Sequence, residues 1–196
     1  MDISLTSFID FVLKSGSPKM TCAKKIKNQI GEVYDPIKDY YKRFRDAIQE
    51  LHKHGRPKND ISEIIGELPS SKLENYKKME AGYKRFMGNK RISWFPPERE
   101  NWFHGNLNIP INPEVGLEWN GEKYLVKLYL KSAKPSKDKI SCVLALMRIT
   151  IPESDYSLAV LDVRNGKLFL YEENMLQLLP LVEGEAESLE FILGKI

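Results

Sequence analysis

One dipeptide, Asn120-Gly121, constrains the fold of this chain more than any other feature of its sequence. It separates two runs that are rich in strand-forming residues, VGLEW and EKYLVKLYLK. Asn-Gly is the preferred pair for the two-residue turn of a type I′ hairpin, because both central residues need a positive φ angle. The sequence therefore predicts an antiparallel hairpin with Asn120 and Gly121 as its turn.

The same turn sets the register of the hairpin, because side chains alternate between the two faces of a sheet. Counting outward from the turn pairs Glu118 with Lys123 and Glu114 with Lys127. The face expected to be buried carries Val115, Leu117, Trp119, Tyr124, Val126 and Leu128. The opposite, more polar face carries Glu114, Gly116, Glu118, Lys123, Leu125, Lys127 and Tyr129. Such a charged face is typical of a solvated hairpin.

A second hairpin is expected around Asn165-Gly166, between an apolar run over residues 156–164 and a shorter one over 167–171. Ser136 can cap a helix that contains Ile140 and Met147, although the run VLALMRITI is also compatible with a strand; we favour the helix. Residues 185–196 have helical apolar spacing and are expected to dock on the sheet.

The first ninety residues show the apolar spacing of consecutive amphipathic helices. Start and stop signals place these helices at about residues 7–14, 18–33, 36–51 and 71–86, with a further capping box at Asp60 and Glu63. The overall prediction is an α+β protein. A helical, basic region over residues 1–91 is expected to pack as one unit with a hairpin-rich α/β region over residues 92–196, which contains a small antiparallel or mixed sheet.

Charge is distributed unevenly along the chain. Residues 1–100 carry 20 Lys and Arg against 14 Asp and Glu, a net charge of +6, whereas residues 101–196 carry 10 against 13, a net charge of −3. A basic surface attracts phosphate, although a solvated helix face is the simpler interpretation. If the surface binds a polyanion, the residues expected to contribute are Lys38, Lys42 and Arg45, opposite the apolar stripe of the third helix.

An aromatic connector, WFPPERENWFHG, follows the helical region. Its two prolines prevent helix propagation. Its aromatic rings can join the helical half to the sheet or, as an alternative, stack on nucleic-acid bases. His104 lies in this connector and has two interpretations: a metal ligand or general base, or a side chain that makes a structural hydrogen bond.

Three linked blocks, WFPPERENWFHG, NPEVGLEWNGEKYLVKLYLK and VLDVRNGKLF, resemble an uncharacterised family of bacterial proteins. The resemblance extends from about Trp94 to Phe169 and implies no particular activity.

The expected order of elements, αβββαβ, is also similar to the core of PD-(D/E)xK nucleases, with strands near residues 106–111, 114–119 and 124–130 and a last strand through Asp162. This resemblance implies Mg²⁺ held by carboxylates and a lysine beside the nucleophile. Its catalytic residues would be Glu114, Glu118 and Lys127, although leucine or tyrosine stands where the E-x-K acid is expected, before Lys127 or Lys131. Cross-strand ion pairs on a solvated face explain the same residues without catalysis.

Other observations limit the functional classes. The chain has no Walker-type GxxxxGK[ST], GxGxxG, GxSxG or HExxH motif. Cys22 and Cys142 are expected to be buried and unpaired, and we assign no metal ligands. No apolar run has the length of a membrane span and the N-terminus has no basic start, so we expect a cytoplasmic protein without membrane association.

The leading hypothesis is therefore a non-catalytic binding protein without a cofactor, whose partner is nucleic acid or another protein. The alternative is a divergent Mg²⁺-dependent, nuclease-like enzyme.

Overall fold

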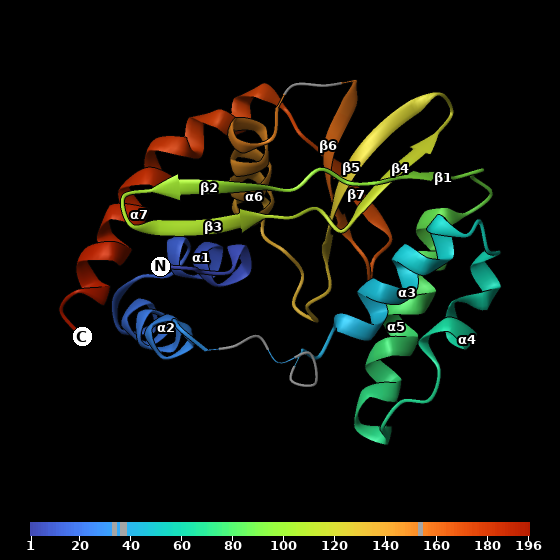
Figure 1. The fold of residues 1–196 in the computed structure, drawn as a ribbon, viewed down its shortest axis with the longest axis horizontal. Helices are drawn as coiled ribbons and strands as arrows, with labels where there is room; N and C mark the ends of the chain where they lie inside the picture. The colour runs from blue at the N-terminus through green and yellow to red at the C-terminus, as the bar shows by residue number, and fades with distance from the viewer. Residues whose placement is uncertain (33–34, 36–38, 153–154) are drawn as a thin grey trace.

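The computed structural model describes residues 1–32, 35, 39–152 and 155–196 and has an α+β fold (Figure 1). The α-helices in these ranges are α1 (Leu5–Val12), α2 (Gly16–Gln29), α3 (Lys42–Lys53), α4 (Ile61–Ile65), α5 (Ser70–Met87), α6 (Lys137–Thr150) and α7 (Leu179–Leu193). The strands are β1 (Ser93–Phe95), β2 (Glu100–His104), β3 (Leu107–Ile111), β4 (Val115–Trp119), β5 (Glu122–Tyr129), β6 (Tyr156–Asp162) and β7 (Lys167–Leu170).

The central sheet has five strands in the order β1-β4-β5-β6-β7. Strands β5 and β6 run parallel and α6 connects them, whereas the other neighbouring pairs are antiparallel. Strands β2 and β3 form a separate antiparallel pair. The strand expected near residues 106–111 therefore lies outside the central sheet, and β1 occupies the edge beside β4.

The first predicted hairpin is confirmed in both turn and register. Asn120 has a φ angle of 54° and Gly121 one of 80°, as a type I′ turn requires. Glu118 pairs with Lys123 and Val115 with Val126, so the apolar and polar faces are those expected.

The second hairpin lies where it was predicted but has a longer turn. Asp162 pairs with Lys167, which leaves four residues in the connection. Gly166 has a positive φ angle and Asn165 does not. The side chain of Asp162 instead accepts hydrogen bonds from the backbone N–H and the side-chain amide of Asn165, and these bonds close the turn.

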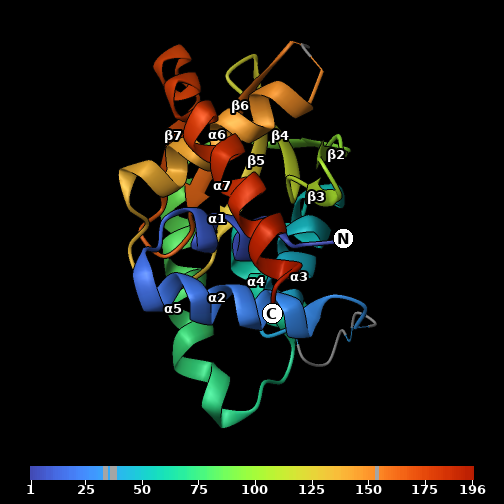
Figure 2. The ribbon, with the colours of Figure 1, turned by 90° about the vertical axis from the view of Figure 1, so that its left-hand side faces the viewer.

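The central sheet is covered on both faces, so the expectation of a solvated polar face was wrong. Helices α3, α4 and α5 cover the face that carries Val126, and α1, α2, α6, α7 and the β2-β3 pair lie on the other side, as Figures 1 and 2 show. Leu125, on the nominally polar face, is completely buried in a hydrophobic cluster with residues of α1, α2, α6 and α7. The parallel β5-α6-β6 connection places a helix on that face, which explains its burial.

Each hydrophobic cluster contains residues from both predicted regions, 1–91 and 92–196. The aromatic connector contributes Trp102, which packs against Phe8 of α1 with 5.6 Å between ring centroids. Phe103 remains 68% exposed. The connector therefore joins the N-terminal helices to the strands, as expected.

Helix boundaries differ from the prediction in two places. Helix α3 begins at Lys42, directly after a turn in which the Asp39 side chain accepts the backbone N–H of Tyr41; the expected start at residue 36 lies outside the described residues. Helix α7 begins at Leu179, ahead of the expected residue 185. The helix prediction for α6 is confirmed, and the Ser136 hydroxyl caps it by accepting the N–H of Lys139.

Both cysteines are free thiols; Cys142 is buried and Cys22 partly buried. Among the described residues, no helix combines the length and apolar character that crossing a bilayer requires.

Candidate functional site

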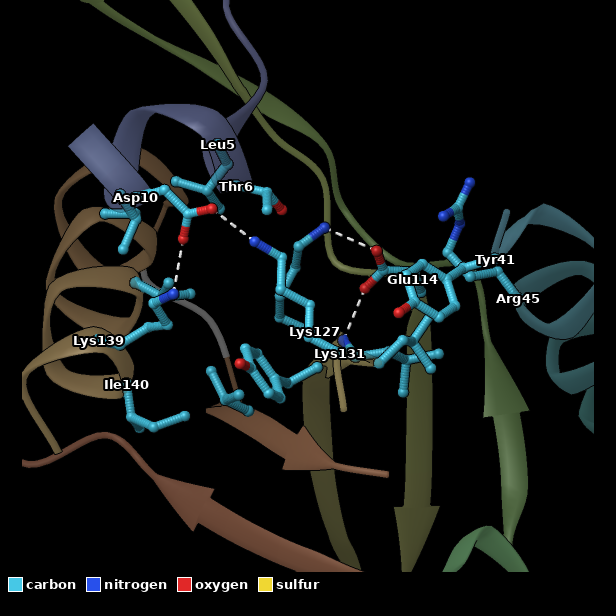
Figure 3. Close-up of a pocket in the computed structure, with 16 residues that line it drawn as sticks. Leu5, Thr6, Asp10, Tyr41, Arg45, Glu114, Lys127, Lys131, Lys139 and Ile140 are labelled. Atoms are coloured by element: carbon cyan, nitrogen blue, oxygen red, sulfur yellow. Dashed lines mark hydrogen bonds and ion pairs between the residues drawn. The ribbon is translucent and has the colours of Figure 1, made fainter. Parts of the chain in front are cut away.

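A highly charged hollow lies at the carboxyl end of β5. The parallel neighbour β6 ends on the same side. After β5, the chain passes through Lys131 and enters α6. Crevices outside the carboxyl ends of parallel strands are common ligand sites, because no strand continues there to fill the space. Helix α1 and the segment before β4 close the hollow from two other sides (Figure 3).

Asp10 of α1 holds two lysines in this hollow. Its carboxylate oxygens accept one bond each from the ammonium groups of Lys131 and Lys139, both at 2.6 Å. Burial alone raises the pKa of Asp10, but the two lysines outweigh this effect and its pKa lies below the ordinary value. Asp10 is therefore ionised at neutral pH and ties α1 to both ends of the β5-α6 connection.

Glu114 forms a second charged centre beside the first. One carboxylate oxygen accepts a bond from the Lys127 ammonium at 2.7 Å, and the other accepts the backbone N–H of Leu128, also at 2.7 Å. Lys127 additionally donates to the carbonyl oxygen of Asn112 at 2.8 Å. Figure 3 shows the ammonium groups of Lys127 and Lys131 side by side, one directed to Glu114 and the other to Asp10.

This hollow is the middle part of a longer groove. Its lining shares Arg45, Glu114 and Lys127 with a second hollow and Asp10 and Lys139 with a third, so the three adjoin. The basic side chains that line the groove are Lys14, Lys42, Arg45, Arg99, Lys127, Lys131, Lys134 and Lys139. The acidic side chains are Asp10, Asp46 and Glu114.

The basic lining exceeds the acidic lining by eight side chains to three. Asp39 offsets one further charge from outside the lining, because it pairs with Arg45. Lys42 pairs with Asp46 at the rim, where the two side chains are 37% and 53% exposed. Arg99 and Lys134 are exposed, and within the described residues neither is in an ion pair. The groove therefore keeps a positive potential that favours anions.

The structure brings together some of the predicted site residues and separates others. Glu114 and Lys127 form the predicted cross-strand ion pair. Glu118 lies further along β4, and its expected partner Lys123 pairs instead with Asp155 at 2.6 Å. Lys42 and Arg45 line the groove, and Lys38 lies outside the described residues.

The described residues do not gather several carboxylates into one site, as a nuclease does to hold Mg²⁺. They contain no cluster of three or more His, Cys, Asp or Glu side chains that could hold a metal ion. Both oxygens of Glu114 already accept hydrogen bonds, and Asp162 is bonded to Asn165. The ionised groups at this end of the sheet are arranged as ion pairs.

Sequence reasoning did not assign Asp10, Arg99, Lys134 or Lys139 to a site. A signal was present, because KSAKPSKDK places four lysines within residues 131–139. The negative net charge of residues 101–196 obscured it. Asp10 could not be found from sequence, since it reaches its lysines over more than 120 positions.

Fold and site together define an α+β protein with a lysine-rich groove at the carboxyl end of a parallel strand pair. No family model, curated protein or solved structure matches the chain. The resemblance of its sequence blocks to a bacterial family stays a prediction.

Proposed function

We propose that this chain is a non-catalytic nucleic-acid-binding protein and that the groove is its binding surface. The observation that supports the proposal is the set of eight basic side chains along three adjoining hollows. A single small anion needs only one or two cations, whereas a run of phosphates requires cations spaced along a path. The groove provides that spacing.

Exposed and partly buried cations have different roles in this proposal. Lys42, Arg99 and Lys134 stand at the exposed rim and supply contacts to phosphate. Lys127, Lys131 and Lys139 are paired with Glu114 and Asp10, so a phosphate at these ammonium groups would compete with the two carboxylates. Phosphate contacts of this kind carry affinity without sequence specificity.

The test is the salt dependence of binding by a charge-reversed variant. Replacing Lys42, Arg99 and Lys134 with Glu should weaken binding of a fluorescent oligonucleotide and make the slope of log K against log salt shallower by about 2, since each lost phosphate contact removes about 0.7 to 0.9. The matched control replaces Lys24, Lys53 and Lys77, exposed lysines outside the groove, with Glu. Equal loss in both variants would show that net charge alone drives binding, and would overturn the assignment of the groove.

The second candidate is the nuclease-like enzyme, which one feature of the fold favours. From α5 onward, α5, β1, β4, β5, α6 and β6 follow the αβββαβ order, with β2 and β3 inserted after β1. Cleavage of circular single-stranded DNA on addition of Mg²⁺, lost in Glu114→Gln and Lys127→Met, would support it. Intact DNA after prolonged incubation would contradict it.

A further inference from the structure

The middle of the groove contains a cavity whose inner wall is apolar. Its volume is about 200 Å³. Leu5, Ile9, Ile140 and Val160 line it, and each is at most 5% exposed. These side chains come from α1, α6 and β6, so three elements enclose the space. Its interior therefore favours a group without charge.

The size of the cavity limits what it can hold. A cavity of roughly 150 Å³ lined by aliphatic side chains accommodates a benzene ring. Drug-sized ligands occupy pockets of about 300 Å³ or more. A volume of 200 Å³ thus suits one planar ring system and is too small for a complete ligand of several rings. Tyr41 and Tyr129 also line it, and aromatic side chains at such a site can pack against a ring.

The mouth of the cavity has the opposite character. Lys127 and Lys131, with side chains 19% and 36% exposed, line it together with Arg45. A ligand with its ring inside would have the rest of its atoms among these cations. A planar ring attached to an anionic backbone on both sides is the chemistry of a nucleotide within a strand.

We propose that the cavity receives one base of a single-stranded nucleic acid while the flanking phosphates lie along the groove. This inference rests on the proposed nucleic-acid-binding function and adds the class of ligand. A base within a duplex is paired and stacked, and extracting it costs free energy. A single strand presents its bases without that cost, and base stacking on aromatic side chains tolerates any sequence.

The first experiment uses the unmodified protein and three probes of equal length, about ten nucleotides. These are a fluorescent single strand, the same sugar-phosphate strand without bases, and a duplex. We expect the single strand to bind about tenfold more tightly than the abasic strand, with the duplex also weaker than the single strand. Equal affinity for the intact and abasic strands would overturn the base cavity and leave the groove standing. No binding of any probe at low salt would overturn the proposed function itself.

The second experiment fills the cavity. Val143 lines it from α6, and Val143→Phe should lower the affinity for the single strand to that for the abasic strand, which should itself remain unchanged. Ile149→Phe is the matched control, because Ile149 is 42% exposed on the same helix and lines no part of the groove. If a folded Val143→Phe protein, checked by circular dichroism, still prefers the intact strand tenfold, the cavity does not hold a base. If the variant does not fold, the abasic comparison decides alone.

Discussion

The backbone of Gly82 lies against the carbonyl oxygen of Val163, so closely that a Cβ atom added to Gly82 would come within 2.1 Å of that oxygen. The carbonyl oxygen of Arg164 would be 2.4 Å away. From the other side, a Cβ on Gly166 would meet the carbonyl oxygen of Gly82 at 2.7 Å. Helix α5 and the β6-β7 turn therefore meet backbone to backbone, and only glycine fits at the contact.

We expect Gly82→Ala to destabilise the protein by about 1 to 3 kcal/mol, because the added methyl group must push α5 away from the turn. The opposing gain in helix propensity is only about 1 kcal/mol or less. Chemical denaturation monitored by circular dichroism measures the difference in unfolding free energy.

Gly184→Ala is the matched control, since Gly184 lies within α7 with nothing near its added Cβ. It should stabilise the protein by about 0.5 to 1 kcal/mol. If both variants changed stability in the same direction, the close contact would not control the outcome.

Local turn chemistry allowed much of the fold to be predicted. The Asn120-Gly121 pair determined the register of β4 and β5, and the Ser136 cap located the start of α6. These features depend on residues adjacent in sequence, so a single sequence contains the necessary information. The start of α3 at Lys42 was missed, because it depends on the Asp39 side chain, which accepts the backbone N–H of Tyr41 in a turn just before the helix.

The candidate site was only partly predictable. The Glu114 and Lys127 pair followed from the hairpin register. The burial of the sheet face that carries this pair could not be predicted from the hairpin, because it depends on where α1 and α6 pack. The bonds of Asp10 to Lys131 and Lys139 require the assembled fold, since α1 is remote in sequence from both lysines.

Asn120 provides a test of the turn. Asn120→Val should cost about 1 to 2 kcal/mol of stability, because a β-branched residue is strained at a φ angle of 54°. Asn120→Gly should be close to wild type, since glycine adopts positive φ without strain. Thermal or urea denaturation of the two variants gives the comparison; equal stability would contradict the type I′ assignment.

His52 makes stability depend on pH. It lies in the last turn of α3 and is buried, with its Nε2 atom 2.6 Å from the hydroxyl oxygen of Tyr83. Burial lowers the pKa of His52 to about 4. An unfolded histidine has a pKa of about 6.5, so below that pH the unfolded state binds the proton more strongly.

The contribution of neutral His52 to the unfolding free energy should therefore be fully present above pH 6.5, and the unfolding free energy should fall by about 3 kcal/mol as the pH approaches 4. His52→Gln should flatten the pH dependence of the unfolding free energy in this window. His54→Gln, which removes an exposed imidazole two residues away, should preserve it. An unchanged slope in His52→Gln would assign the pH dependence to other groups.

Asp10 occupies two lysines that a phosphate could also use, so its removal should change stability and binding in opposite directions. Asp10→Asn leaves Lys131 and Lys139 without their shared carboxylate, which should lower the unfolding free energy by about 1 to 3 kcal/mol. The same change releases two ammonium groups for phosphate contacts.

Affinity for a single-stranded oligonucleotide should therefore rise, and the slope of log K against log salt should steepen by up to about 1.4. Glu74→Gln, an exposed acid of α5 outside the groove, is the control for the change in net charge and should alter neither quantity appreciably. If Asp10 only formed a structural ion pair remote from the ligand, its replacement would lower stability without raising affinity. Both effects together are expected only if the Asp10 carboxylate competes with the ligand for Lys131 and Lys139. Weaker binding by folded Asp10→Asn would show that the nucleic acid binds elsewhere on the protein.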